Sequence, residues 1–161
     1  MSLDSDIQLL ARVRLFQGFL PDHLRLLAFG AEARTLGRGT RLFQRDTMSD
    51  GGYVVVHGQI DLISGLHDSV ISSHGPASLI GEMALITETI TPATAVAVEH
   101  SEVLKIPRPL FRRMLNEYPQ LAGVLQERIT DSVSEFVGKL DTIRAKLDHA
   151  TDLANRPQKS S

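Results

Sequence analysis

Between about residues 31 and 106 the chain consists of short apolar or alternating runs interrupted by glycine, and this pattern constrains the fold most. Short runs rich in β-branched and aromatic residues are typical of strands, whereas helices need longer segments with a 3.6-residue period. This central segment is therefore predicted to be a β-domain. The clearest runs are residues 40–43, 53–56, 59–63 and 70–71.

Helical patterns flank the β-domain on both sides. Within residues 1–30, Asp4 or Asp6 can cap a first helix, and Pro21 is well suited to begin a second one. The predicted architecture is thus mainly β with flanking helices and one long C-terminal helix. The expected units after the β-domain (31–106) are a short helix (107–118), a long dimerisation helix (119–150) and a disordered tail (151–161).

Along the long helix, apolar residues recur in alternating steps of four and three, which is the heptad spacing of a coiled coil. At about 1.5 Å per residue this apolar stripe is roughly 30 Å long, enough for a modest two-stranded coil. Homodimerisation through the stripe is the favoured interpretation. The alternative is a helix that lies back over its own β-domain and completes the core. The stripe consists of Ile129, Val133, Phe136, Leu140, Ile143, Leu147 and Ala150.

The composition narrows the chemistry of the chain. With 161 residues, 42% hydrophobic and 22% charged, it fits one globular domain plus an extension. There is no cysteine, so neither disulfides nor thiolate chemistry are expected. A net charge of −2 argues against a protein whose main task is gripping DNA. Because the first residues lack a signal-peptide pattern and no apolar run reaches about 18 residues, a cytoplasmic protein without membrane contact is expected.

Neither a metal site nor a catalytic site is predicted. The six histidines show no close two-ligand spacing such as His-x-x-x-His. His67 and His74 bracket a short polar hairpin, where solvated turn residues are the simplest interpretation. No nucleophile elbow, lysine-containing phosphate loop or metalloprotease motif occurs, so the chain is not expected to be an enzyme.

The most distinctive motif is IGEMALI at residues 80–86, followed by ATAVA at 93–97. The first turn of a helix carries unpaired N–H groups and a partial positive charge, which suits an anion, and Gly81 permits close approach of the backbone. Together with the turn glycine Gly58, this motif resembles the ligand cassette of cyclic nucleotide-binding domains. The resemblance covers about residues 14–130 and implies an eight-stranded β-roll, a double-stranded β-helix similar to a jelly roll.

The resemblance also implies a ligand and its contacts. In the family's arrangement Glu82 would accept a hydrogen bond from a ribose hydroxyl, while the small residues Ala93 and Thr94 would leave room beside the ligand. The implied ligand is cyclic AMP or cyclic GMP. The contacts predicted in this way are Gly81, Glu82, Met83, Ala84, Thr91, Ala93 and Thr94.

The family's phosphate-binding arginine is missing, because that position falls on Thr91 or, with the proline aligned, on Ala93. No lysine or arginine occurs anywhere in residues 46–104. A charge-assisted hydrogen bond contributes about 1.5–3 kcal/mol, so its loss should weaken phosphate binding by about one to two powers of ten. Arg41, Arg45 or the C-terminal helix could supply part of the missing charge.

Arg45 departs from the family pattern in a second way, since a glycine usually stands there before the aspartate. If the turn needs a positive φ, either Arg45 is strained or the turn differs. Arginines are frequent in the N-terminal third. They are interpreted either as scattered surface charge or as a face that contacts an acidic partner or a second subunit's phosphate site. They are Arg12, Arg14, Arg25, Arg34, Arg38, Arg41 and Arg45.

The sequence thus predicts a regulatory sensor in which a ligand in the β-roll repositions the helices after residue 106. Two alternatives stay open: a protein-interaction module that has lost the ligand, and a less anionic small molecule in the same pocket. Regulators of the catabolite activator type continue into a helix-turn-helix. Only about ten residues follow the apolar stripe here, so direct DNA binding is not expected.

Overall fold

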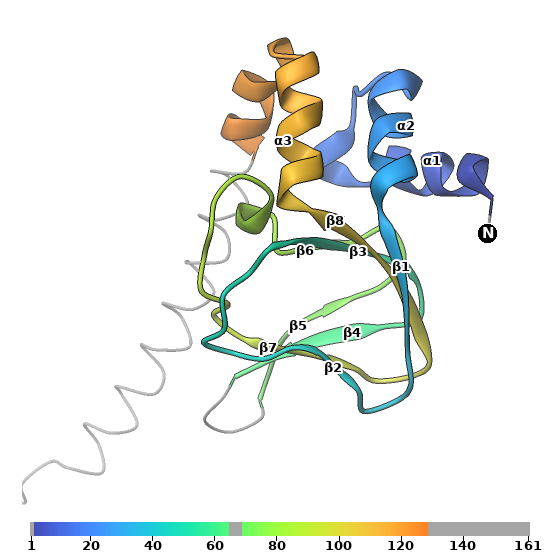
Figure 1. Ribbon diagram of the computed structural model, residues 1–161. Coiled ribbons are helices and arrows are strands. Elements are labelled where there is room, and N and C mark those ends of the chain that lie inside the picture. The colour runs from blue at the N-terminus through green and yellow to red at the C-terminus, as the bar shows by residue number, and fades with distance from the viewer. Residues whose placement is uncertain (1, 65–68, 129–161) are drawn as a thin grey trace, which may run out of the picture.

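The computed structural model describes residues 2–64 and 69–128, which form a helical layer on one side of a two-sheet β-roll (Figure 1). The described part is therefore mainly β with flanking helices, as predicted. Its helices are α1 (Leu3–Ala11), α2 (Pro21–Gly30) and α3 (Arg108–Glu117), with the 3₁₀ turns η1 (Arg14–Phe16) and η2 (Met83–Leu85). Its strands are β1 (Glu32–Leu36), β2 (Arg41–Phe43), β3 (Gly51–His57), β4 (Ile60–Ile63), β5 (Val70–His74), β6 (Leu79–Ile80), β7 (Thr94–Ala97) and β8 (Ser101–Pro107).

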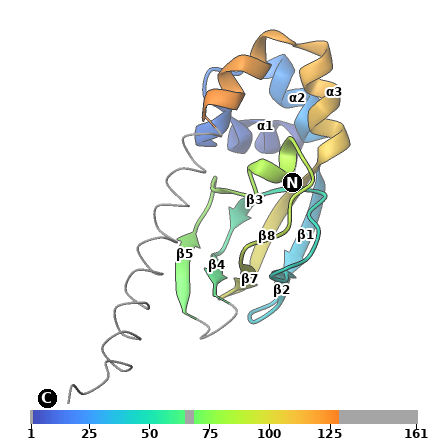
Figure 2. The same cartoon turned by 90° about the vertical axis from the view of Figure 1, so that its left-hand side faces the viewer.

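The strands form two antiparallel sheets with the orders β1-β8-β3-β6 and β2-β7-β4-β5. Successive side chains of a strand point to opposite faces, so β3 and β8 contribute to two different cores. Val55 and Val103 pack between the sheets, whereas Val54, Leu104 and Ile106 belong to the core beneath the helices. Figure 2 shows the helices gathered at one end of the β-roll. Both strands are buried on both faces, which explains their nearly continuous apolar runs.

One apolar core joins turn η2 to helical segments that precede and follow the β-roll in the sequence. Phe16 of η1 and Phe111 of α3 are fully buried with ring centroids 6.2 Å apart, and Leu85 of η2 lies in the same cluster. Full burial of such a side chain contributes about 1.5–3 kcal/mol. Because the core is shared, η2 cannot move without repacking against the helical layer.

The turn that leads from β3 of one sheet to β4 of the other lies at Gly58, whose φ is +90°. A left-handed backbone costs other residues roughly 1–2 kcal/mol, and a Cβ at this position would overlap Ser101 Oγ. Ser101 Oγ in turn accepts the Gln59 N–H at 3.1 Å. Backbone and packing therefore both require the turn glycine that the sequence indicated.

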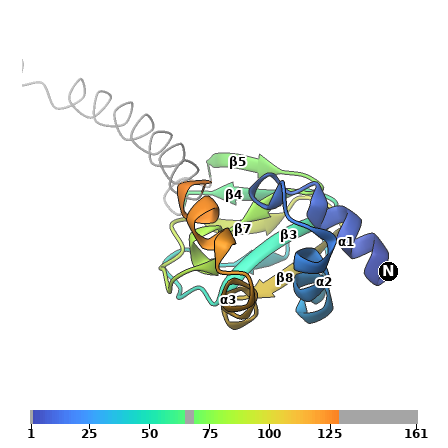
Figure 3. The same ribbon diagram turned by 90° about the horizontal axis from the view of Figure 1, so that it is seen from above.

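After α3 the chain is described as far as Arg128. Residues 120–128 are helical and lie over the same sheet as α2 and α3 (Figure 3). Arg128 Nη1 donates to the backbone oxygens of Leu15 at 3.0 Å and Gln17 at 2.6 Å, which fastens this helical segment to η1. The predicted apolar stripe from Ile129 to Ala150, the dimerisation through it and the tail lie outside the described residues. In the described ranges, no helix combines the length and the apolar character needed to cross a membrane.

Candidate ligand-binding site

A cavity of about 340 Å³ is lined by residues of both sheets and of η2. Its apolar wall includes Phe43, Tyr53, Leu62 and Ile80, and the rings of Phe43 and Tyr53 lie 5.9 Å apart between centroids. Tyr53, Leu62 and Ile80 also belong to the core between the sheets. The cavity therefore adjoins that core, in a space that side chains do not fill. Its volume lies in the range of small-molecule sites.

The predicted Gly-Glu cassette forms one wall of this cavity, since Gly81, Glu82, Met83 and Ala84 all line it. Gly81 has a φ of +83° and directs the chain from β6 into η2. Within the turn, the N–H groups of Ala84 and Leu85 donate back to the oxygens of Gly81 and Glu82, each at 3.1 Å. Glu82 Oε2 is buried. The cassette thus offers the cavity a closely approaching backbone and a carboxylate acceptor.

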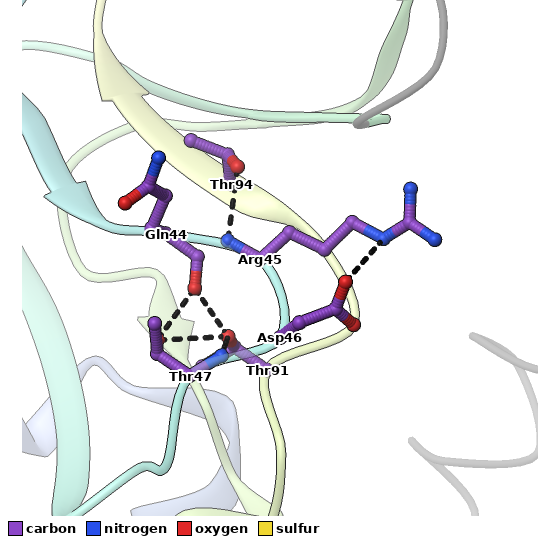
Figure 4. A network of polar contacts seen from close by, with 6 residues as sticks. All are labelled: Gln44, Arg45, Asp46, Thr47, Thr91 and Thr94. Carbon is purple, nitrogen blue, oxygen red and sulfur yellow. Dashed lines mark hydrogen bonds and ion pairs between the residues drawn. The ribbon is translucent and has the colours of Figure 1, made fainter.

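The Thr91 side chain, at one of the two positions expected for the missing arginine, is bonded into the loop between β2 and β3. Its Oγ1 donates to the Gln44 oxygen at 2.5 Å and accepts the Thr47 N–H at 3.1 Å (Figure 4). Thr47 Oγ1 donates to the same Gln44 oxygen at 2.5 Å. Thr91 and Ala93 both line the cavity. The hydroxyl of Thr91, however, is engaged as donor and as acceptor with backbone groups.

Thr94 is not among the described residues that line the cavity, and its Oγ1 accepts the Arg45 N–H at 3.0 Å (Figure 4). Of the two possibilities for Arg45, strain or a different turn, the structure shows a different turn. The left-handed residue is Asp46, with a φ of +64°. Aspartate tolerates this conformation better than most residues, so the loop avoids strain at Arg45.

Few charged side chains line the cavity. Asp50 lies at its rim, where Lys105 Nζ is 2.7 Å from Asp50 Oδ2. The hydrogen bond from Lys105 holds the pKa of Asp50 below its ordinary value. Among the described lining residues, Arg14 of η1 is the one arginine or lysine. Within residues 2–64 and 69–128, no group of three or more potential ligand side chains could hold a metal ion.

Sequence reasoning missed six polar residues of the lining: Arg14, Ser49, Asp50, Ser72, His74 and Thr89. The interpretation of His74 as a solvated turn residue is wrong, because β5 extends to His74 and pairs it with Ile60. Ser72 Oγ and His74 Nε2 are 2.9 Å apart, so the two side chains share one face of β5. Their i, i+2 spacing was a usable signal, whereas nothing in the sequence near Arg14 pointed to the cavity.

Arg108 joins the cavity wall directly to α3. Its Nε donates to the Ala84 oxygen at 2.9 Å, and its Nη2 donates to the Ser49 oxygen at 2.6 Å. Its backbone N–H donates to the Asp50 oxygen at 2.8 Å. Ala84, Ser49 and Asp50 all line the cavity, so the first residue of α3 is hydrogen-bonded to three positions of the lining.

The profile of the cyclic nucleotide-binding domain matches residues 33–118. Among solved structures, a cyclic nucleotide-binding-like protein from Brucella abortus bv. 1 str. 9-941 is 43% identical, with a TM-score of 0.63. That match covers 70% of this chain and 99% of the Brucella chain. Catabolite activator protein from Thermus thermophilus is 26% identical, with a TM-score of 0.67, over 81% of this chain and 62% of that one.

Similarity also extends to part of a much longer protein. Lysophospholipase NTE1 of Pyricularia oryzae (strain 70-15) is 25% identical over 159 residues, which covers 92% of this chain and 11% of the lysophospholipase. The chain therefore spans about a tenth of the length of the curated relatives that it matches.

Proposed function

The chain belongs to the cyclic nucleotide-binding domain family, and we propose that it is a regulatory sensor domain whose β-roll binds a small ligand. The observation that carries this proposal is the cavity of about 340 Å³ beside the cassette. Protein interiors are normally close-packed, and a void forfeits contacts. A hollow that retains Gly81 and Glu82 in its wall is therefore best explained by an occupant.

The proposed ligand is cyclic AMP or cyclic GMP, or a related molecule that carries hydroxyl groups. Glu82 accepts a hydrogen bond from a ribose hydroxyl, and the backbone at Gly81 and Met83 lies beside the phosphate. Ala93, which is 1% exposed, has a small side chain and therefore leaves room for the ligand on that side of the cavity. The phosphate is held without the usual arginine. Thr91 does not replace it, because its hydroxyl is bonded to the loop at Gln44 and Thr47.

Coupling from the ligand to the helices is proposed to pass through Arg108. A ligand that fits one position of η2 better than another shifts the Ala84 oxygen, to which the Arg108 side chain is bonded. Arg112 provides a second link, since its Nη2 donates to the Ile86 oxygen at 3.2 Å. Both arginines lie on α3, so the state of the cassette biases the position of α3.

The remaining functional assignments extend beyond the cavity. We propose a homodimer formed through the C-terminal apolar stripe that begins at Ile129, and a further protein partner that recognises the arrangement of the helices. The module is proposed to be cytoplasmic and non-catalytic, and to act without metal, DNA or membrane contact. The activity of the lysophospholipases is not transferred, because the match covers about a tenth of their length.

One observation favours a second candidate, a degenerate dimeric interaction module that has lost its ligand. The family's arginine is expected at Thr91 or Ala93, neither of which is charged, and the Thr91 hydroxyl is hydrogen-bonded to the loop between β2 and β3. In that case the cavity is a remnant, and the C-terminal helix and the basic N-terminal face are the working surfaces.

Calorimetric titration with cyclic AMP and cyclic GMP at low salt tests the proposal. We expect saturable binding to the wild-type protein and an affinity about 10- to 100-fold lower for Glu82→Ala, which removes the hydroxyl acceptor. Glu88→Ala is the matched control, because Glu88 is an exposed carboxylate close to the cassette that does not belong to the described lining. Its affinity should equal that of the wild type.

Two outcomes would contradict the proposal. Absence of heat from the wild-type protein up to millimolar nucleotide would favour the interaction module or an unrelated ligand. Equal affinity of Glu82→Ala and the wild type for the nucleotide would show that Glu82 of the cassette does not contact the ligand. Denaturation midpoints of all three proteins establish that each is folded during the titration.

A further inference from the structure

We infer that an anionic ligand of this cavity is held by Arg14, which η1 contributes from outside the β-roll. The inference rests on the proposed function and specifies which residue meets the negative charge. Residues 46–104 contain no lysine or arginine, so the β-roll's own ligand-binding segments carry no permanent cation. Of the described residues around the cavity, Arg14 supplies the guanidinium. Arg41 and Arg45, which the sequence suggested as substitutes, are not among the described lining.

The position of Arg14 is fixed by its neighbours. Val13, Leu15 and Phe16 are between 1% and 3% exposed and belong to the helical core. The backbone of η1 is closed by the Phe16 N–H, which donates to the Val13 oxygen at 2.9 Å. Arg14 itself is an exposed residue, so its charge pays little desolvation while its side chain reaches the cavity. The buried neighbours thus fix the backbone from which the Arg14 side chain reaches the cavity.

The other charged groups of the lining define the complementary ligand. Glu82 accepts hydrogen bonds, and Asp50 is already engaged by Lys105 at 2.7 Å. A ligand complementary in charge to these lining groups carries a hydroxyl or N–H donor beside Glu82 and an anionic group beside Arg14. A cyclic nucleotide meets both requirements, with its phosphate directed to η1 and not only to the cassette.

This assignment places the ligand's charge on the element that connects both helical parts of the molecule. Arg128 donates to the backbone oxygens of Leu15 and Gln17, the residues that flank Phe16 in and after η1. An anion bound by Arg14 therefore acts on the segment to which helical residues 120–128 are fastened. Occupancy of the cavity then biases that helical segment through η1, independently of the Arg108 contact.

Calorimetric titration of the full chain with cyclic AMP and with uncharged adenosine separates the charge contribution from the rest of the ligand. We expect Arg14→Ala to lower the affinity for cyclic AMP about 10- to 100-fold and to leave the affinity for adenosine unchanged. Arg14→Lys should lose less, because it keeps the charge. Arg12→Ala is the matched control, since Arg12 is a nearby exposed arginine outside the described lining, and it should bind as the wild type does.

The outcomes distinguish this inference from the proposed function. If Arg14→Ala binds cyclic AMP as tightly as the wild type while Glu82→Ala loses binding, the sensor stands and Arg14 is wrong. Equal affinity of the wild type for adenosine and cyclic AMP likewise overturns the role of Arg14. If neither compound binds the wild-type protein, the proposed function fails and this inference fails with it. Denaturation midpoints of the variants exclude loss of folding as the cause.

Discussion

The cassette at residues 81–84 and the segment at residues 91–94 border the same cavity, yet their polar groups serve different ends. Glu82 lines the cavity with its Oε2 buried, and Gly81 lines it beside Glu82 with a positive φ. Thr91 and Thr94 direct their hydroxyls to backbone groups of the loop between β2 and β3. A position that contacts ligand in the family can thus be retained as a support for the fold. The two segments should therefore respond differently to substitution.

The largest effect on stability is expected at Thr91. Thr91→Val preserves the volume of the side chain but removes the hydroxyl, so the part-buried bonds from the Thr47 N–H and to the Gln44 oxygen are lost. We expect the free energy of unfolding to fall by about 1–3 kcal/mol, with cyclic AMP affinity nearly unchanged. Chemical denaturation and calorimetry measure the two quantities. Glu82→Ala should show the reverse profile, with weaker binding and little change in stability.

Thr87→Val provides the matched control for this substitution. Thr87 is exposed and lies in the loop after η2, so the same chemical change there should alter stability by less than about 0.5 kcal/mol. If Thr91→Val proved as mild as Thr87→Val, the loop contacts would contribute nothing to stability. The distinction between the two segments would then lose its energetic basis.

Gly81 and Gly39 allow the backbone requirement to be separated from the binding requirement. Both have positive φ values, +83° and +84°, and an added Cβ meets nothing closer than 3.5 Å at Gly81 and nothing within 4 Å at Gly39. Gly81→Ala and Gly39→Ala should each cost about 1–2 kcal/mol in stability, because both force alanine into a left-handed backbone. Affinity for cyclic AMP should fall only for Gly81→Ala. Equal loss of affinity in both variants would mean that general destabilisation, not the cassette, controls binding.

The features that sequence reasoning predicted correctly are those with local signals. Pro21 does begin α2, the run at residues 53–56 does lie within β3, and the Gly-Glu pair does lead into a helical turn. The missed features depend on contacts between distant segments. Arg14 reaches the cavity from more than 50 residues upstream of the cassette, and no local pattern records that approach.

Hydrogen-bond partners were equally invisible to sequence reasoning. Thr94 read as a small residue beside a ligand, but its hydroxyl bonds the Arg45 N–H, and this choice depends on the path of the loop between β2 and β3. The same loop places its left-handed residue at Asp46, one position later than the family pattern indicated. Six of the seven residues that the family resemblance suggested as ligand contacts line the cavity, but the resemblance could not tell that Thr94 does not.

Asp50 forms a third part of the lining, where both the stability effect and the binding effect should be smallest. The hydrogen bond from Lys105 lowers the pKa of Asp50 below 3.8, so the folded protein binds this proton less tightly than the unfolded chain does. The stabilisation is therefore fully present above about pH 4 and is lost as the pH falls through the lower pKa of the folded state. The Asp50 side chain is 71% exposed, which limits the contribution of the pair to less than about 1 kcal/mol.

Asp50→Asn should consequently reduce the free energy of unfolding slightly at pH 7. The difference from the wild type should shrink as the pH falls below the ordinary pKa of an aspartate, 3.8. Glu88→Gln, at an exposed carboxylate outside the described lining, should show no such convergence. Unlike Glu82→Ala, Asp50→Asn should strengthen cyclic AMP binding, because it removes a negative charge from the rim and leaves Lys105 without its carboxylate. Weaker binding would instead indicate that Asp50 contacts the ligand, as Glu82 is proposed to do. Ligand binding would then not be confined to the cassette, and Asp50 would belong to the ligand-binding part of the lining.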